Sequence, residues 1–170
     1  MYKRQERYRF DKLHYLPNYI DYNGFSGKHV LDVGCGLGTD LSLFAKGGAN
    51  VSGVDIAPQA IHYAKENFAW RKLNADLQVM DGEALGFDDN SFDFIYCHTV
   101  LHFTSNPADM IAEIKRVLKP GGQALLMTIN RASWLYALHK LAGLKIDYLD
   151  APVFHPVSYT HLTLPTTPYV

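Results

Sequence analysis

A glycine-rich loop with an acid just ahead of it is the segment best suited to chemistry in this 170-residue chain. It reads DVGCGLGTD and begins at Asp32. Glycines let the backbone turn tightly and approach a ligand without a Cβ in the way. Thr39 stands where a dinucleotide fingerprint has its third glycine, and Asp32 adds negative charge where a phosphate would gain nothing from it. The loop therefore favours a cationic or amine-bearing ligand, with a purely structural turn as the alternative. Its candidate ligand-binding residues are Asp32, Gly34, Cys35, Gly36 and Gly38.

Two further acids end apolar runs later in the chain. Asp55 stands in GVDI and Asp81 in MDGEAL. A carboxylate about 20 residues beyond such glycines is placed to accept hydrogen bonds from both hydroxyls of a ribose. Asp81 is suited to accept from an exocyclic amine such as that of adenine, with Ile56 or Met80 flanking the ring. A helix cap or loop acid at Asp55 and a turn residue at Asp81 are the alternatives.

Two histidines in the segment CHTVLHF, His98 and His102, are candidate proton acceptors. Imidazole titrates near neutral pH, so either side chain can orient or deprotonate an acceptor group. Helix capping or packing against a cofactor is the alternative for both. His102 is the preferred candidate.

Five apolar runs alternate with segments of helical spacing. Strands are predicted at 29–33, 50–56, 76–80, 92–97 and 123–129. Helices are predicted after the first run, from Pro58 and from Asn106-Pro107, and KPGG (119–122) is predicted as a tight turn. This order indicates an α/β fold of the Rossmann-like, doubly wound kind, with a mainly parallel sheet and helices on both faces. Ligands of such sheets bind beyond the carboxyl ends of the strands.

The segments VLDVGCGLG, GVDI, MDGEAL, FDFIYCHTVLHF and LKPGGQALL together resemble the class I S-adenosylmethionine-dependent methyltransferases. The similarity is strongest to the small-molecule, methyltransferase type 11-like group, and it covers a core of about residues 28–130. It implies S-adenosyl-L-methionine as the cofactor and S-adenosyl-L-homocysteine as the product. No metal site is expected.

The resemblance also implies roles for individual residues. Asp32 and the glycine loop would hold the methionine part of the cofactor, with Asp32 reaching its amino group. Asp55 would hold the ribose, and Asp81 with Gly82 would meet the adenine. Cys97 would place its backbone carbonyl near the methionyl end.

Methyl transfer to a small-molecule acceptor is the predicted function. Transfer from a sulfonium is an in-line displacement in which proximity and orientation are the main catalytic effects. A non-catalytic S-adenosylmethionine-binding domain is the first alternative. A nicotinamide-dependent oxidoreductase is the second, disfavoured by GxGxG in place of GxGxxG and by Asp32 and Asp81.

Composition limits the partners that this chain can have. A formal net charge of −1 gives no electrostatic footprint for nucleic acid. Two cysteines without a paired pattern suggest a reducing compartment. No apolar run approaches the roughly 20 residues of a membrane span, so a cytoplasmic location is expected. Nothing in the sequence indicates an oligomeric state.

The two ends of the chain look unlike the core. Back-translation of MYKRQ and VSYTHLTLPT resembles a transposase-type sequencing adapter on opposite strands. Within a single domain of residues 1–170, we therefore expect 1–5 and 157–170 to be non-native, and the terminal antiparallel strands of the fold to be missing. Residues 131–156 are predicted as a possible lid segment.

Overall fold

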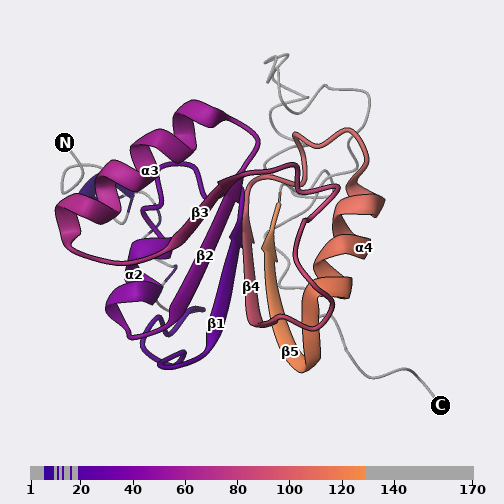
Figure 1. Ribbon diagram of the computed structural model, residues 1–170, viewed down its shortest axis with the longest axis horizontal. Coiled ribbons are helices and arrows are strands. Elements are labelled where there is room, and N and C mark those ends of the chain that lie inside the picture. The colour runs from indigo at the N-terminus through magenta and orange to yellow at the C-terminus, as the bar shows by residue number, and fades with distance from the viewer. Residues whose placement is uncertain (1–5, 10, 12, 14–15, 17–18, 129–170) are drawn as a thin grey trace, which may run out of the picture.

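A parallel sheet of five strands forms the centre of the computed structural model, which describes residues 6–9, 11, 13, 16 and 19–128 (Figure 1). The strands are β1 (His29–Val33), β2 (Asn50–Asp55), β3 (Asp76–Val79), β4 (Phe92–His98) and β5 (Leu118–Met127). They lie in the order β3-β2-β1-β4-β5, and all neighbouring pairs are parallel. The strand order reverses between β1 and β4, the place where ligands of such sheets bind.

Helices cover both faces of this sheet. They are α2 (Leu41–Lys46), α3 (Pro58–Arg71) and α4 (Pro107–Val117). Figure 1 shows α2 and α3 on one side of the sheet and α4 on the other. Pro58 and Pro107 both stand in the first helical turn, where a missing N–H costs nothing. The predicted doubly wound α/β class is therefore confirmed.

Side chains that alternate along the strands build two separate cores. On β1, Val30 belongs to the core under α2 and α3, whereas Leu31 belongs to the core under α4. The same alternation places Tyr96 of β4 in the first core and Ile95 in the second. Because successive side chains of a strand point to opposite faces, Asp32 shares a face with Val30. This alternation decides which site residues can meet.

The segment KPGG differs from the tight turn predicted between helix and strand. It lies inside β5 as the structure delimits that strand, with Gly121 at a φ of +78°. Phe92 of β4 pairs with Leu118, but Phe94 pairs with Gln123, so the register shifts around the segment. The chain does turn there, and the strand resumes its pairing afterwards. The sequence pattern predicted the position of the turn but not the strand pairing of Leu118, which precedes it.

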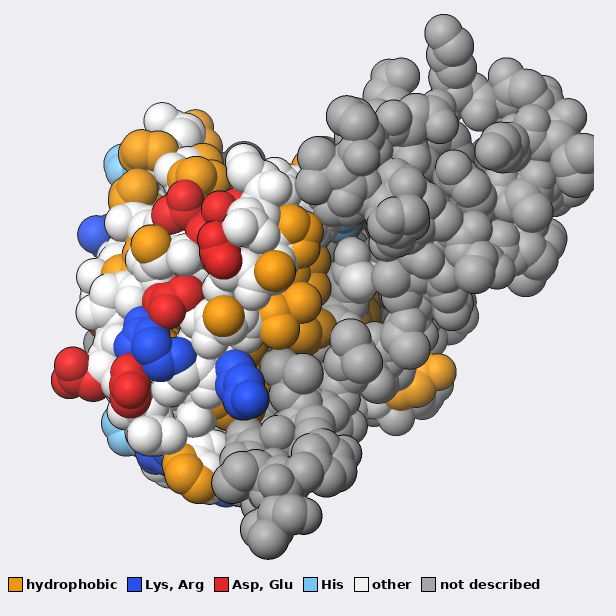
Figure 2. All heavy atoms as spheres, turned by 90° about the vertical axis from the view of Figure 1, so that its right-hand side faces the viewer, with side chains coloured by type: hydrophobic (Ala, Val, Ile, Leu, Met, Phe, Trp, Pro, Cys, Tyr) orange, Lys and Arg blue, Asp and Glu red, His pale blue; other side chains and the backbone are white. Residues whose placement is uncertain are grey.

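The surface on the α4 side carries mixed charge. Figure 2, which looks onto this side, shows acidic and basic side chains gathered close to one another. Arg116 of α4, for example, pairs with both Glu113 and Asp89. Among the described residues, no helix is both long and apolar enough to cross a lipid bilayer.

Several predictions fall outside the described residues. These are the adapter-derived ends at 1–5 and 157–170, the possible lid at 131–156 and the missing antiparallel strands beyond β5. They stay predictions.

Candidate cofactor-binding and active site

A cleft of about 300 Å³ opens where β1, β2 and β3 end. Its walls come from the ends of these strands, from the loop after β3 and from the loop after β4. The lining residues are Val33, Gly34, Val54, Asp55, Ile56, Met80, Asp81, Gly82, Glu83, Val100, Phe103, Thr104, Ser105 and Met110. The cleft therefore lies next to the reversal of strand order between β1 and β4, as expected for a ligand site in this fold.

The glycine loop after β1 holds its shape with its own hydrogen bonds. The N–H groups of Gly34 and Cys35 both donate to the carbonyl oxygen of Val54, at 2.8 and 2.9 Å. The Gly36 N–H donates to the Asp55 carboxylate at 2.9 Å. A phosphate-binding loop needs such N–H groups directed at the ligand. These three are already used, so the geometry agrees with the prediction that the loop is not a phosphate cradle.

Gly34 is also required by what packs on it. Its φ is +76°, and an added Cβ would overlap the side chain of Val100 from the loop after β4. Gly36, at a φ of +53°, has no atom of the described residues within 4 Å of the position of such a Cβ. The two glycines thus differ: one accommodates a neighbouring loop, and the other faces open space.

Gly38 and Cys35 do not line the cleft. A Cβ on Gly38 would lie 2.9 Å from the ring of Phe68, so this glycine lets α3 approach the loop closely. The Cys35 side chain is buried, and burial together with the nearby carboxylates of Asp32 and Asp55 raises the pKa of its thiol. Both residues act through packing in this structure, and their predicted contact with a ligand stays a prediction.

Asp55 links the ends of two strands at the edge of the cleft. One carboxylate oxygen accepts from Gly36 N, and the other accepts from the backbone N–H of Ala57 at 2.9 Å. A carboxylate offers about four acceptor positions. Two positions therefore remain for hydroxyl groups of a ligand, while the two backbone bonds hold the side chain in place.

The end of β3 supplies the next wall. Asp81 is exposed, and its carboxylate accepts from Glu83 N at 2.9 Å, which makes it a turn residue as well as a lining residue. Gly82 is buried because Met110 of α4 occupies the space that a Cβ would need. Ile56, which follows β2, is 69% exposed and lines the cleft. An apolar side chain left in water at a cleft is available to a ligand ring.

Glu83 joins the loop after β3 to the loop after β4. Its Oε1 accepts from the hydroxyl of Thr104 and from the backbone N–H of Asn106, the latter at 2.8 Å. These hydrogen bonds lower the pKa of Glu83 below its ordinary value. Sequence reasoning missed this residue, because nothing in MDGEAL indicates a partner 21 residues away.

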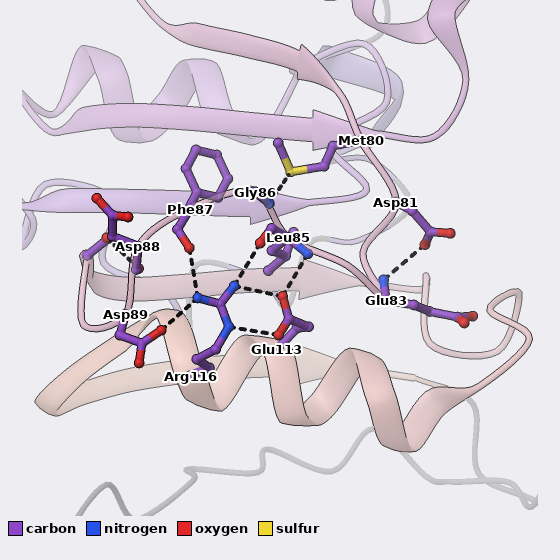
Figure 3. A network of polar contacts seen from close by, with 11 residues as sticks. Met80, Asp81, Glu83, Leu85, Gly86, Phe87, Asp88, Asp89, Glu113 and Arg116 are labelled. Atoms are coloured by element: carbon purple, nitrogen blue, oxygen red, sulfur yellow. Dashed lines mark hydrogen bonds and ion pairs between the residues drawn. The ribbon is translucent and has the colours of Figure 1, made fainter.

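Arg116 of α4 fastens the rest of the loop after β3 (Figure 3). Its guanidinium makes five hydrogen bonds of 2.7–2.8 Å, to Glu113, Asp89 and the carbonyl oxygens of Phe87 and Leu85. A guanidinium has five N–H donors, so all are used. Glu113 in turn accepts from Leu85 N at 2.8 Å. The loop that carries Asp81 and Glu83 is therefore tied to a helix whose inner face is buried.

A second polar group lies on the other face of the sheet. Asp32 and Asp40 are only 3% and 5% exposed. Asp40 accepts from Arg9 through both oxygens, with Nε at 2.6 Å, and from the Tyr96 hydroxyl at 3.0 Å. No hydrogen bond from the described residues reaches the carboxylate of Asp32. Burial and the charge of Asp40 raise the pKa of Asp32 well above its ordinary value, and the charge of Arg9 opposes this shift.

His98 belongs to this second group. Its ring stacks on that of Tyr96, with centroids 6.0 Å apart. The Thr99 hydroxyl donates to the His98 carbonyl, so the 3.1 Å contact between Thr99 Oγ1 and His98 Nδ1 assigns the ring proton to Nδ1. Nε2 is then the lone-pair nitrogen, and it has no hydrogen-bond partner among the described residues. Burial lowers the pKa of His98 to about 4.

His102 and Cys97 are buried and do not line the cleft. His102 lies beside Phe103, with ring centroids 4.1 Å apart, and burial lowers its pKa. Cys97 points into the core under α4, where burial raises the pKa of its thiol to about 12. His98, unlike His102, stacks on Tyr96 of the second polar group, and both predicted catalytic roles stay predictions.

Comparisons with known proteins agree with this geometry. A family model described as "Methyltransferase domain" matches residues 31–126. The chain belongs to this methyltransferase domain family. It is 39% identical over 129 residues to a ubiquinone biosynthesis O-methyltransferase of Coxiella burnetii, covering 75% of this chain and 54% of that protein. The chain spans about half the length of the curated relatives that it matches.

Solved structures show the same methyltransferase-type fold. A protein of Pyrococcus horikoshii matches with a TM-score of 0.67 at 28% identity, over 82% of this chain and 64% of that one. The [4+2]-cyclase SpnF matches with a TM-score of 0.62 at 30% identity, over 64% of this chain and 41% of that one. The family predicted from the sequence is confirmed, and one of these neighbours is named as a cyclase.

Seven predicted site residues of this methyltransferase domain fall into two groups, whereas Cys35, Gly36, Gly38, Cys97 and His102 do not line the cleft. The cleft on the α4 side brings together Gly34, Asp55, Ile56, Asp81 and Gly82. Asp32 and His98 lie on the opposite face of the sheet, with Arg9, Asp40 and Tyr96, which were not predicted. Both groups adjoin the reversal of strand order.

Proposed function

We propose that this chain transfers a methyl group from S-adenosyl-L-methionine to a small-molecule acceptor. Membership of the methyltransferase domain family supports this assignment. The single observation that carries it is Asp55, a fixed carboxylate with two free acceptor positions, beside a glycine loop whose N–H groups are already used. That combination suits the diol of a nucleoside and not the pyrophosphate of a dinucleotide.

The residues present fit this cofactor in several respects. Asp55 would accept from the ribose hydroxyls. Ile56 and Phe103, 69% and 71% exposed, are apolar surfaces in the cleft that an adenine ring would cover. Asp32 is a buried carboxylate without a hydrogen bond from the described residues, as a site for an ammonium group requires. Asp81 with Gly82 would meet the adenine edge, and the carbonyl of Cys97 the methionyl end.

When bound, S-adenosylmethionine supplies an electrophilic methyl group on a sulfonium with a good leaving group. The chain itself then has to bind, orient and exclude water. In this proposal His98 Nε2, a buried ring nitrogen without a hydrogen-bond partner among the described residues, accepts a hydrogen bond from an acceptor hydroxyl. Because burial lowers the pKa of His98, this histidine is a better hydrogen-bond acceptor than a full proton acceptor. His102 is the second candidate for this role.

Relatives named ubiquinone biosynthesis O-methyltransferase suggest which acceptors to test first. An O-methyl product requires a hydroxyl acceptor, so hydroxylated aromatic precursors of quinones are the first compounds to offer. A cytoplasmic location and a small-molecule partner remain part of this proposal. The alternative is an S-adenosylmethionine-binding domain without methyl transfer, and the neighbour named as a cyclase is a protein of this fold that carries the name of a different reaction.

Calorimetric titration with S-adenosylmethionine, S-adenosylhomocysteine and NAD tests the cofactor assignment. We expect binding of the first two and none of NAD, and an Asp55→Ala variant should bind both adenosyl ligands much more weakly. Binding of NAD alone would overturn the proposal. Turnover of methyl-labelled cofactor on hydroxylated aromatics then separates an enzyme from a binding domain: tight binding with no labelled product from any acceptor would favour the latter.

A further inference from the structure

Glu83 spans the two loops that wall the cleft. It stands on the loop after β3 and accepts hydrogen bonds from Thr104 and Asn106 on the loop after β4. Glu83 and Thr104 both line the cleft, so these hydrogen bonds cross from one wall to the other. A contact between two walls fixes the width of the opening between them.

The loop after β4 is held at its beginning and at its end. Thr99 N donates to the Met127 carbonyl at 2.6 Å, and Pro107 begins α4. Thr99 has a φ of +58°, a conformation that costs energy for a threonine and is common at functional sites. Between these points Phe103 is 71% exposed and lines the cleft. Glu83 attaches this stretch of the loop to the facing wall.

Of the two loops, the loop after β3, which carries Glu83, is the one that hydrogen bonds hold to α4. Arg116 and Glu113 fix residues 85–89 to α4, and Asp81 accepts from Glu83 N (Figure 3). In contrast, the Glu83 side chain is partly exposed, and hydrogen bonds at such a position exchange readily for bonds to solvent. The loop after β3 is therefore fixed to α4, whereas its hydrogen bonds to the loop after β4 can break and re-form.

We propose that Glu83 is a positioning residue that latches the loop after β4 (residues 99–106) across the cleft and sets the rate at which the adenosyl ligand enters and leaves. The proposal rests on the proposed function for the identity of that ligand. Glu83 stays ionised through the neutral range, because its hydrogen bonds to Thr104 and Asn106 lower its pKa. It therefore remains an acceptor for both donors whenever the loop is closed.

Hydrogen exchange tests the latch without any ligand. In Glu83→Ala, the amide of Asn106 should exchange faster than in the wild type, while amides in β1 and β4 keep their rates. Asp88→Ala is the matched control, since it removes an exposed acid from the same loop. Glu83→Gln keeps an acceptor oxygen and should restore much of the protection. Unchanged exchange at Asn106 in Glu83→Ala would overturn the latch, whatever the ligand proves to be.

Dissociation of S-adenosylhomocysteine, followed by rapid mixing, tests the effect on ligand exchange. We expect the dissociation rate to rise roughly 5- to 150-fold in Glu83→Ala, as the loss of two hydrogen bonds predicts. Thr104→Val should raise it less, and the double variant should not exceed Glu83→Ala. A single-turnover methyl-transfer rate that falls as much as dissociation rises would indicate a role in the chemical step and overturn the proposal.

Failure of the proposed function is distinguishable from failure of the latch. If S-adenosylhomocysteine does not bind the wild type, the proposed function and the exchange-rate claim both fall, while hydrogen exchange still reports on the loop. If the wild type binds but Glu83→Ala and Asp88→Ala release the ligand at equal rates, the latch alone is wrong.

Discussion

Removal of Arg9 should destabilise the fold more than removal of any exposed charge near it. Arg9 donates to both oxygens of Asp40, which also accepts from Tyr96 and is 5% exposed. In Arg9→Gln, the Asp40 charge would stay buried beside the carboxylate of Asp32 and would lose the cation that the described residues pair with it. An uncompensated buried charge is among the most destabilising changes that one substitution makes.

The size of this effect follows from burial. Breaking a buried ion pair by removing one partner costs about 3–5 kcal/mol. Since the Arg9 side chain is 27% exposed, solvent screens part of the interaction, and about 2–3 kcal/mol is expected. With a urea m-value of roughly 2 kcal/mol/M, the unfolding midpoint should fall by about 1 M.

Urea denaturation followed by circular dichroism measures this shift. Arg7→Gln is the matched control, because Arg7 is an exposed arginine two residues away. Arg7→Gln should change the urea unfolding midpoint by less than the experimental error. In Arg9→Gln with Asp40→Asn, the buried charge is gone and part of the loss should be recovered. Equal midpoints for Arg9→Gln and Arg7→Gln would refute the reasoning, as would additive losses in the double variant.

Three further predictions concern the site. Asp32→Asn should weaken binding of S-adenosylmethionine. It should nevertheless be more stable than the wild type, increasingly so as pH rises above about 4, because the raised pKa of Asp32 makes its ionisation costly in the folded state. Urea midpoints measured across pH would check the stability difference. The neutral, buried His98 should make wild-type stability fall by up to about 3 kcal/mol from pH 6.5 to 4, and His98→Gln should flatten that fall in the same titration. Gly34→Ala should cost about 2–4 kcal/mol through its positive φ and the Val100 contact, against about 1 kcal/mol for Gly36→Ala, by thermal unfolding; equal losses would contradict the packing argument.

The fold could be predicted because its signals are local. Apolar runs, the prolines at 58 and 107 and the acids at strand ends each depend on a few neighbouring residues. The parallel sheet then brings the strand ends together without further information. Asp55 and Asp81 were found in this way, and both line the cleft.

The missed contacts join residues far apart in sequence. Arg9 lies 31 residues from Asp40, and Glu83 lies 21 residues from Thr104. A lone arginine or glutamate carries no periodic signal, so its partner emerges only from packing. Sequence spacing also gave no sign that Asp32 and Asp81 would stand on opposite faces of the sheet, because that depends on strand alternation and on the path of the loop after β3.

The hydrogen bonds that hold the glycine loop affect the entropy of ligand binding. Because Gly34, Cys35 and Gly36 already donate to Val54 and Asp55, the loop has little conformational freedom left to lose when a ligand arrives. Ordering of flexible segments is a main cost of association. Calorimetry should therefore show a smaller entropic penalty from this loop than from a loop that orders on binding, and most ordering that does occur should come from residues 99–106.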